Sequence, residues 1–332
     1  MTEQPVIEVH DLRVSLGTDD GNIEAVAGIS FRVREGETLA LVGESGAGKS
    51  VTSLAIMRLL QAGEGSKAVG IGGRILFRDR DAGTIDLLGL QPEAMRRMRG
   101  HDLAMIFQEP MTCLNPVMRV GDQIAEAVLA HEKVSSRTAM TRAIDMLRLV
   151  GIPDPASRSR VFPHELSGGM RQRVMIAMAL ACQPRLLIAD EPTTALDVTV
   201  QAQVLDLIRR LQREFSMGVL FITHDLGVVA QIADRVAVMY AGRIVEEAPV
   251  EDLFAHPLHP YTRGLLASVP DATQAGNIVQ PIPGSMPALS HLPQGCSFQP
   301  RCHAALAGRC EREAPPAIAA GCRSVHCWLH AA

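Results

Sequence analysis

One segment near the N-terminus limits the possible folds more than any other: "GESGAGKS", from Gly43 to Ser50. It follows the apolar run "ETLALV", which has the pattern of a buried strand, and it opens "KSVTSLAIMRLL", whose apolar residues have helical spacing. A glycine-rich turn between a strand and a helix is the setting that a phosphate-binding loop requires. We therefore expect an α/β fold in which this loop binds the phosphates of a nucleotide.

Each part of this loop has a chemical reason. Glycines let the backbone turn tightly, so that successive N–H groups face phosphate oxygens, and the next helix adds the positive end of its dipole. Lys49 can reach the β- and γ-phosphates, and Ser50 can ligate Mg²⁺. The residues expected to contact the nucleotide are Gly43, Glu44, Ser45, Gly46, Ala47, Gly48, Lys49, Ser50 and Val51.

A second strand ends in carboxylates. The run "LLIADE" begins as a buried strand and ends at Asp190 and Glu191. Ligands bind at the carboxyl edge of parallel sheets, so Asp190 is expected to hold Mg²⁺ through water. Glu191 is expected to polarise the water that attacks the nucleotide.

The order of patterns predicts the domain organisation. Residues 6–16 and 24–33 alternate apolar and polar positions, as half-buried strands do, and strand–helix alternation after residue 165 predicts a parallel sheet covered by helices. Residues from about 91 to 180 are helix-rich, and a Pro- and Gly-rich stretch follows residue 277. We expect a nucleotide-binding domain over 1–262, with its helical subdomain at about 91–180, and an extension over 263–332.

Charge and hydropathy restrict the partners and the compartment. The formal net charge of -4 argues against nucleic acid as a partner, because such domains are usually basic. No apolar run reaches the roughly 18 residues that span a bilayer, and the first residues lack a signal-peptide pattern. We therefore expect a cytosolic protein, in which clustered cysteines are more often metal ligands than disulfides.

Further segments carry a resemblance to a known family. These are "FQEP" with Gln108, "ELSGGMRQRV" from Glu165, "TALD" from Thr194, and "ITHDL" with His224. In order and spacing, from about residue 6 to 261, they resemble the motifs of ATP-binding cassette (ABC) transporter ATPases. The resemblance implies a P-loop NTPase with a RecA-like core, an antiparallel β subdomain and an α-helical signature subdomain.

The resemblance also implies a dimeric mechanism. Two ATPases would pair head to tail, with ATP between the phosphate loop of one and Ser167, Gly168 and Gly169 of the other. ATP would drive closure, and hydrolysis would reset it. Gln108 would contact Mg²⁺ and the attacking water, His224 would hold the γ-phosphate, and these two would act with Glu191. One departure is the absence of an aromatic residue before Val26 to stack on adenine, where Leu16 stands instead.

Three features resemble the dipeptide/oligopeptide importer branch: Met170 in the signature, the "QEPMTCLNPVMRVGDQIAE" stretch, and "HPLHPYTRGLL" before a cysteine-bearing tail. This branch implies an ATPase at the cytoplasmic face of the bacterial inner membrane. Its partners would be two permease subunits, a second and paralogous ATPase and, indirectly, an extracytoplasmic solute-binding protein. The helical subdomain would dock a coupling helix of a permease.

Other functions stay open at this point. Related branches import nickel, glutathione or antimicrobial peptides. A soluble cassette ATPase of DNA repair or translation is less favoured, because the chain has one cassette and no heptad run. A metal-sensing interaction protein is disfavoured by the intact set of Lys49, Asp190 and Glu191.

The last part of the chain holds five of the seven cysteines. Their spacing matches neither common zinc ribbons nor ferredoxin runs, so spacing alone says only that a four-thiolate site is possible. Similar tails of peptide-importer ATPases read "C-x-F-x-x-R-C…C…C" and imply a 4Fe–4S cluster held here by Cys296, Cys302, Cys310 and Cys327. Zinc, or free or disulfide-bonded cysteines, are the alternatives, and Cys322 could replace Cys327. A metal would act as a staple for a tail with little core.

Overall fold

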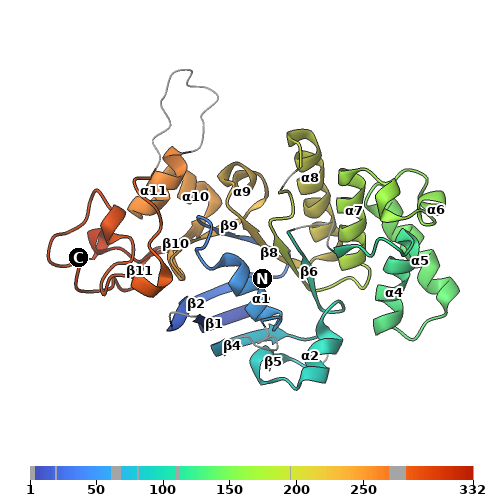
Figure 1. Cartoon of the computed structure of the whole chain (residues 1–332), viewed down its shortest axis with the longest axis horizontal. Helices are drawn as coiled ribbons and strands as arrows, with labels where there is room; N and C mark the ends of the chain where they lie inside the picture. The colour runs from blue at the N-terminus through green and yellow to red at the C-terminus, as the bar shows by residue number, and fades with distance from the viewer. Residues whose placement is uncertain are drawn as a thin grey trace.

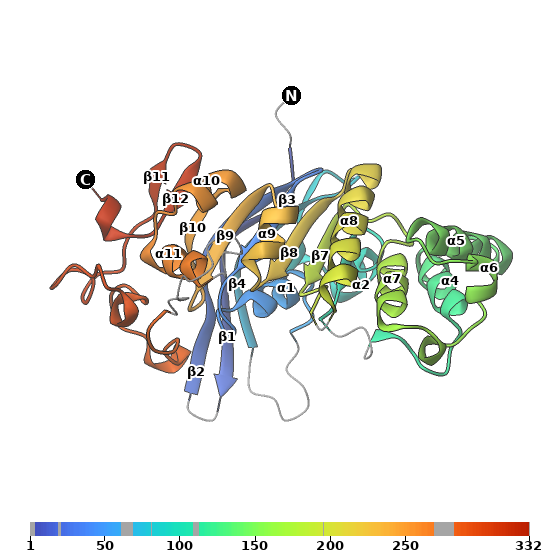
Figure 2. The same ribbon diagram turned by 90° about the horizontal axis from the view of Figure 1, so that it is seen from above.

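Two sheets form the centre of the molecule (Figure 1). The computed structural model describes residues 4–18, 21–60, 69–80, 82–108, 113–194, 196–268 and 282–331. In this described part, helices α4 to α7 lie at one end of the molecule and the C-terminal extension lies at the other (Figures 1 and 2). Residues 109–112, which complete the "FQEP" motif and begin the stretch after it, lie outside the described residues, as does Ala195 of "TALD".

The smaller sheet is antiparallel, and its strand order in the described chain is β2-β1-β4-β5. Its strands are β1 (Pro5–Thr18), β2 (Gly21–Arg34), β4 (Val69–Arg78) and β5 (Thr84–Asp86). A register shift between Val9 and Leu12, where Asp11 has φ +46°, keeps the apolar residues of β1 on the buried face. The two long strands were expected from their alternation, whereas β4 and β5 were not.

The larger sheet has the order β11-β12-β10-β9-β3-β8-β7-β6 among the described strands. Neighbours from β9 to β6 are parallel, while β10 is antiparallel to both β9 and β12. The parallel centre confirms the expected α/β fold. The bounds of these strands are β3 (Thr38–Val42), β6 (Leu103–Ile106), β7 (Leu186–Asp190), β8 (Gly218–Thr223), β9 (Arg235–Tyr240), β10 (Arg243–Pro249), β11 (Ile318–Ala320) and β12 (Arg323–Val325).

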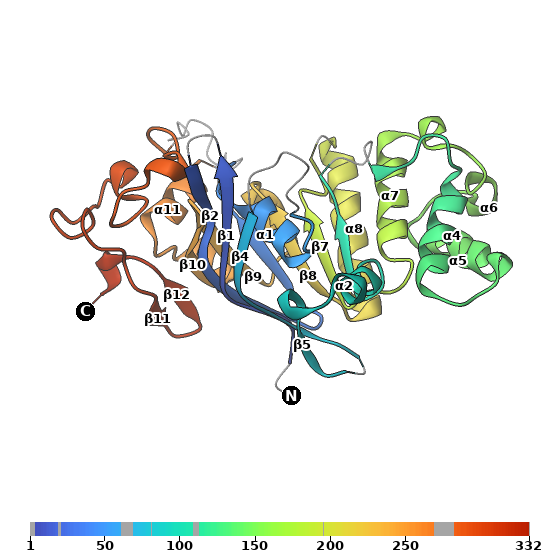
Figure 3. The ribbon, with the colours of Figure 1, turned by 60° about the horizontal axis from the view of Figure 1, so that its bottom comes forward.

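Burial on both faces explains why the central strands are continuous apolar runs. In β8, Leu220 and Ile222 pack in the core that includes α1 (Lys49–Ile56) and the antiparallel sheet. Val219 and Phe221 point to the opposite face, into the core that the helical subdomain shares. Figure 3 shows α1 on the side of the larger sheet that faces β1 and β4.

The remaining helices cover the sheet and form the helical end. They are α2 (Pro92–Met98), α4 (Val120–His131), α5 (Ser136–Leu149), α6 (Pro155–Arg158), α7 (Gly168–Ala179), α8 (Val198–Phe215), α9 (Leu226–Ile232), α10 (Val250–Ala255) and α11 (Pro260–Ala267). Side chains at the N-caps fix several helix starts: Ser135 accepts a hydrogen bond from the Thr138 N–H at 3.1 Å, as an N-cap does.

The hairpin β11–β12 and the side chain of Phe298 are two of the contacts between the extension and the main body. The hairpin adds to the edge strand β10 at Glu246 and Glu247. Phe298 is buried and packs edge-on against Tyr240. Helix α11 crosses residue 262, where we placed the boundary between two domains, and that division stays a prediction.

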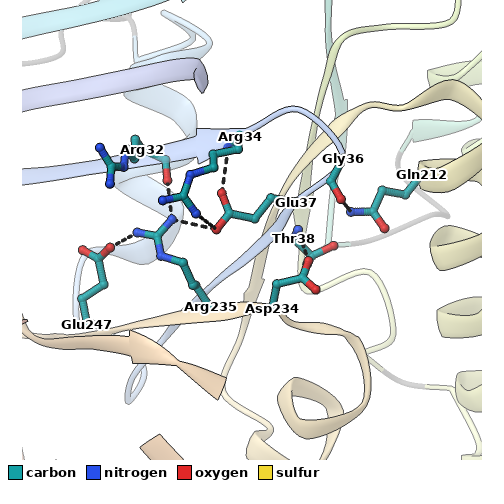
Figure 4. A network of polar contacts seen from close by, with 9 residues as sticks. All are labelled: Arg32, Arg34, Gly36, Glu37, Thr38, Gln212, Asp234, Arg235 and Glu247. Atoms are coloured by element: carbon teal, nitrogen blue, oxygen red, sulfur yellow. Dashed lines mark hydrogen bonds and ion pairs between the residues drawn. The ribbon is translucent and has the colours of Figure 1, made fainter. Parts of the chain in front are cut away.

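A polar network locks the two sheets together (Figure 4). Arg235, at the start of β9, donates to Glu37 Oε1 at 2.7 Å and to the Arg32 carbonyl at 3.2 Å, and it also pairs with Glu247 on β10. Glu37 is almost fully buried and accepts a second bond from the Arg34 N–H at 2.8 Å. One guanidinium therefore ties β2 to the strands β3, β9 and β10.

Removing this guanidinium should destabilise the fold. We expect Arg235→Met to lower the free energy of unfolding by about 3 kcal/mol, because it removes the closer of the two guanidinium groups that pair with the buried Glu37 carboxylate. The matched control is Arg13→Met, which breaks solvent-exposed pairs with Asp11 and Glu24 and should cost less than about 1 kcal/mol. Chemical denaturation of both variants measures the difference in the free energy of unfolding. Equal losses would show that the network stabilises the fold no more than the exposed ion pairs do.

Candidate functional site

The segment Gly43–Ser50 forms the turn between β3 and α1. Lys49 is buried, and its Nζ donates to the carbonyls of Gly43 at 2.8 Å and Glu44 at 3.0 Å, so that it lies across the loop. Gly48 has φ +103°, and a β-carbon there would come within 2.5 Å of the Ala25 carbonyl oxygen. This position needs glycine for its backbone conformation and for the close approach of β2.

Asp190 ends β7 next to this loop. It accepts hydrogen bonds from Ser50 Oγ at 3.1 Å and from Ser53 Oγ at 3.2 Å. Burial raises the pKa of Asp190, and the two hydroxyls act against that shift. Carboxylate and hydroxyl oxygens are donors that suit Mg²⁺, and this carboxylate and the Ser50 hydroxyl already lie within hydrogen-bond distance of each other. The donor set therefore fits the expected ion.

Glu191 contacts both of the other residues expected to be catalytic, Gln108 and His224. Its Oε2 accepts from Gln108 Nε2 at 2.9 Å and from Thr194 Oγ1 at 2.9 Å, and its Oε1 lies 3.0 Å from His224 Nδ1. Burial raises the pKa of Glu191, but the bonds from His224 and Thr194 outweigh burial and leave the pKa lowered. The carboxylate is thus held charged, as a group that accepts a proton from water must be.

The backbone at Glu191 is unusual. Its φ is +47°, in the left-handed region that a residue other than glycine adopts at a cost. The Glu191 N–H donates to the Ile222 carbonyl at 2.9 Å, which anchors this turn to β8. The turn aims the side chain toward Gln108 and His224 rather than along the strand.

The parallel sheet explains why these residues meet. Gln108 follows β6, Asp190 ends β7, His224 follows β8 and the phosphate loop follows β3. The carboxyl ends of parallel strands lie at one edge of a sheet, so residues far apart in the chain are brought to one place.

The signature segment lies elsewhere. Ser167 is the N-cap of α7 and accepts from the Met170 N–H at 3.4 Å, and both Ser167 and Gly168 are exposed. A β-carbon at Gly169 would come within 2.9 Å of Val200. In all three ribbon views, α7 lies farther from α1 than α8 does. Helix α7, whose N-cap is Ser167, thus lies apart from α1, the helix that follows the phosphate loop.

Sequence reasoning missed several contacts of this site. Ser53 and Thr194 support the two carboxylates, as described above. From the C-terminal part of the chain, Tyr261 Oη accepts from the Glu44 N–H at 2.9 Å, and Arg301 pairs with the Glu44 side chain. A signal for Arg301 was present, because it stands in the "C-x-F-x-x-R-C" pattern.

An apolar groove of about 630 Å³ opens beside Gln108. Phe107, the residue before Gln108, has 39% of its surface exposed there, which is unusual for a large aromatic side chain. The other lining residues come from the chain just after α1, the α2–β6 region, the connection before α4, α4 and α7: Met57, Leu59, Arg99, Gly100, Ala104, Met105, Cys113, Ala127, Met175, Met178 and Ala179. The groove therefore lies between the phosphate-loop helix and the helical subdomain.

Four tail cysteines lie near one another. Burial raises the pKa of the Cys296 thiol to about 11. The thiols that raise it further are those of Cys302, Cys310 and Cys327. The Cys310 Sγ accepts a hydrogen bond from the Leu306 N–H at 3.3 Å. Burial raises the pKa of the Cys302 and Cys327 thiols as well, and a backbone N–H near each thiol acts against that shift. Cys322 is exposed, and its thiol instead donates to Asp252 Oδ2 at 3.7 Å.

These thiols are not arranged as a finished ion site. Among the residues that the structure describes, there is no group of three or more His, Cys, Asp or Glu side chains placed to hold a metal ion. In the same residues, no helix has the length and apolar character needed to cross a membrane.

Comparison with known proteins identifies the family. Residues 26–194 match the family described as "ABC transporter", which covers the phosphate loop, Gln108, the signature and both carboxylates. The chain belongs to this family. Residues 245–310 match a second family, described as "Oligopeptide/dipeptide transporter, C-terminal region", which covers Tyr261, Arg301 and three of the four cysteines.

Curated relatives are similar over nearly the whole chain. A putative peptide import ATP-binding protein of Brucella melitensis is 54% identical over 95% of this chain and 94% of its own length. The dipeptide transport ATP-binding protein DppD of Bacillus subtilis is 51% identical, over 98% and 95%. The oligopeptide transport ATP-binding protein OppD of Salmonella typhimurium is 50% identical, over 91% and 87%.

Solved structures confirm the ABC cassette fold. The ATP-binding cassette MJ0796, in a dimeric structure bound to ADP and Pi, superimposes with a TM-score of 0.63 at 24% identity, covering 74% of this chain and 98% of that one. CbiO1 of Clostridium perfringens gives a TM-score of 0.62 at 27% identity, covering 76% and 92%. Both likenesses leave about a quarter of this chain uncovered.

The geometry around Glu191 generates a direct prediction. We expect Glu191→Gln to lower the ATP hydrolysis rate by at least about 100-fold, because the amide cannot take a proton from water. ATP-bound dimers should accumulate, because the phosphate-binding groups remain. Phosphate release and size-exclusion chromatography with ATP measure the two effects.

The matched control is Glu214→Gln on the exposed face of α8, which should hydrolyse ATP at the wild-type rate. Wild-type turnover by Glu191→Gln would show that another group activates the water.

Proposed function

We propose that this chain is the ATP-hydrolysing subunit that energises a membrane importer of di- or oligopeptides. The observation that carries the proposal is the assembled set of Lys49, Asp190 and Glu191 with Gln108 and His224. Relatives named for dipeptide and oligopeptide transport share 51% and 50% of their aligned residues with this chain, which supports the substrate class.

The roles proposed for the loop side follow from the contacts. Lys49 replaces its two carbonyl contacts with contacts to the β- and γ-phosphates of ATP. Ser50 and Asp190 hold Mg²⁺, with Gln108 as a further contact, and the ion when bound neutralises charge that develops on the phosphates. The remaining loop residues, from Gly43 to Val51, offer backbone N–H groups to the phosphate oxygens.

The roles proposed for the other side concern the attacking water. Glu191 orients this water and accepts its proton, while Gln108 fixes the second carboxylate oxygen. His224 is exposed and next to Glu191, so it can turn from the carboxylate to the γ-phosphate. Leu16 is half-buried on β1 and offers an apolar surface to adenine in place of an aromatic ring.

The exposed signature supports a dimer. Ser167 and Gly168 are exposed at the N-terminus of α7, a helix of 12 residues. The positive end of its dipole favours an anion there. We propose that this terminus contacts the γ-phosphate of ATP bound to a second ATPase subunit. ATP then closes the pair, and hydrolysis separates it.

The groove that Phe107 lines, next to Gln108 in the chain, is the proposed contact with a membrane subunit. Its exposed Phe107 and its methionines suit an apolar helix, which we propose to be a coupling helix from one of two permease subunits. Phe107 and Gln108 are adjacent in the chain. A displacement of Phe107 in the groove would therefore also displace Gln108, the residue proposed to contact Mg²⁺. The chain would thus be held at the cytoplasmic face of the membrane by its partners, with a solute-binding protein delivering peptide on the other side.

We also propose that Cys296, Cys302, Cys310 and Cys327 hold a 4Fe–4S cluster. The kind of donor fits, because such clusters are held by cysteine thiolates and all four side chains are thiols. Cys322 is turned away toward Asp252, which supports Cys327 as the fourth ligand. The cluster, when bound, would cross-link the tail.

Uptake in cells tests the proposed function. A strain that lacks this gene should fail to take up a radiolabelled dipeptide, and wild-type protein, but not Glu191→Gln, should restore uptake. The control protein carries Glu214→Gln and should restore uptake fully. If dipeptide uptake is unaffected but nickel or glutathione uptake is lost, the ATPase role stands and the substrate class is wrong.

Metal analysis of protein purified without oxygen tests the cysteine site. We expect about four irons per chain and a broad absorption band at ~400 nm that bleaches on reduction. Cys302→Ser should lose the iron, whereas Cys322→Ser should keep it. A colourless protein with one zinc would retain a metal staple but not a cluster, and protein without metal would remove both.

A further inference from the structure

The C-terminal extension reaches into the phosphate loop through one ion pair. Arg301 Nη1 lies 2.9 Å from Glu44 Oε2, and Nη2 lies 3.2 Å from Glu44 Oε1, so that the contact is bidentate. Glu44 is the second residue of the loop, and the partners are separated by 257 positions in the chain. The pair connects two regions that match different families, one over residues 26–194 and one over 245–310.

Arg301 is firmly held on its own side. Its side chain is only 6% exposed, its Nε donates to the Pro283 carbonyl at 2.9 Å, and its guanidinium lies 5.9 Å from the centre of the Tyr240 ring. Planar, bidentate and stacked contacts of this kind favour arginine over lysine. Because the Arg301 side chain is fixed by these contacts, it determines the position of the Glu44 carboxylate.

The loop receives two more contacts from the same part of the chain. The Glu44 N–H donates to Tyr261 Oη at 2.9 Å, and the Met286 methyl lies against Gly46, where a β-carbon would meet it at 3.0 Å. Both Tyr261 and Met286 follow the region that matches the cassette family. The backbone and the side chain of Glu44 are therefore both held by residues outside 26–194, the range that matches the cassette family.

The negative charge of Glu44 makes its contact with Arg301 relevant to phosphate binding. Burial lowers the pKa of Lys49, and Glu44 is among the carboxylates whose charges oppose that shift, so its charge acts on the residue that is to bind the phosphates. A carboxylate near a polyphosphate repels it, and the repulsion falls when a guanidinium neutralises the carboxylate and holds it aside.

We propose that Arg301 is a positioning residue of the nucleotide site, which neutralises Glu44 and holds it away from the phosphates. The C-terminal extension then sets the affinity of the cassette for nucleoside triphosphates. This inference rests on the proposed nucleotide-binding function.

The test compares three variants of the full chain. Arg301→Met keeps the aliphatic stem but removes the charge, and it should weaken binding of a non-hydrolysable ATP analogue by about fivefold. Glu44→Gln should bind at least as tightly as wild type, because the repelling charge is gone. The double variant should recover most of the affinity that Arg301→Met loses. Isothermal titration calorimetry gives the three dissociation constants.

Two readouts separate positioning from a merely structural role. AMP lacks the β- and γ-phosphates, so its affinity should change much less than that of the triphosphate analogue. In ATP hydrolysis, KM should rise in Arg301→Met with little change in kcat, as expected when only binding is lost. Arg301→Lys keeps the charge and should lose less affinity than Arg301→Met.

Arg309→Met is the matched control. Arg309 stacks on Trp328 with its guanidinium carbon 3.8 Å from the ring centre, in the same tail but away from Glu44. Its loss should leave the triphosphate affinity unchanged. If Arg301→Met is weakened but the double variant is equally weak, Arg301 is only a structural staple and the inference is overturned. If wild type itself binds no triphosphate, the proposed function fails instead.

Discussion

The site depends first on the parallel alignment of β3, β6, β7 and β8. Because these strands end at one edge of the sheet, the phosphate loop, Asp190, Glu191, His224 and Gln108 meet although they are spread over much of the chain. The alignment is maintained by burial on both faces, and the network around Arg235 fixes the antiparallel sheet against it. The geometry of the site is therefore a property of the whole core rather than of the loops alone.

The site already holds opposite charges at close range. Lys49 is buried and contacts two carbonyls, while Asp190 is buried with two hydroxyls and Glu191 is held charged by His224 and Thr194. In the proposed function, ATP with Mg²⁺ would supply partners for Lys49 and Asp190 and so make the buried charges favourable. The left-handed backbone at Glu191 shows that the turn stores some strain to aim this carboxylate.

Local sequence signals predicted the parts of this arrangement that depend on local structure. The strand, glycine turn and helix around Lys49, the strand ending at Asp190, and the helix start at Ser167 follow from patterns within about ten residues. The pairing of β4 with β1, and of β5 with β4, was missed, because β4 is rich in glycine and lacks clear alternation. The contact between Arg301 and Glu44 could not be predicted, since nothing in either segment specifies a partner 257 positions away.

The cysteine tail and the ATP site are parts of one structure. Arg301 lies in a short turn, Gln299–Arg301, whose hydrogen bonds run from Cys296 to Cys302, so these two cysteines bracket the residue that holds Glu44. Phe298, in the same segment, packs on Tyr240 and Tyr261, and Tyr261 accepts the Glu44 N–H. Any group that draws the four thiols together also fixes this turn. The extension has little core of its own, so Arg301 can position Glu44 only if the turn Gln299–Arg301 is rigid. This requirement gives a physical reason for the cysteines and Arg301 to occur together.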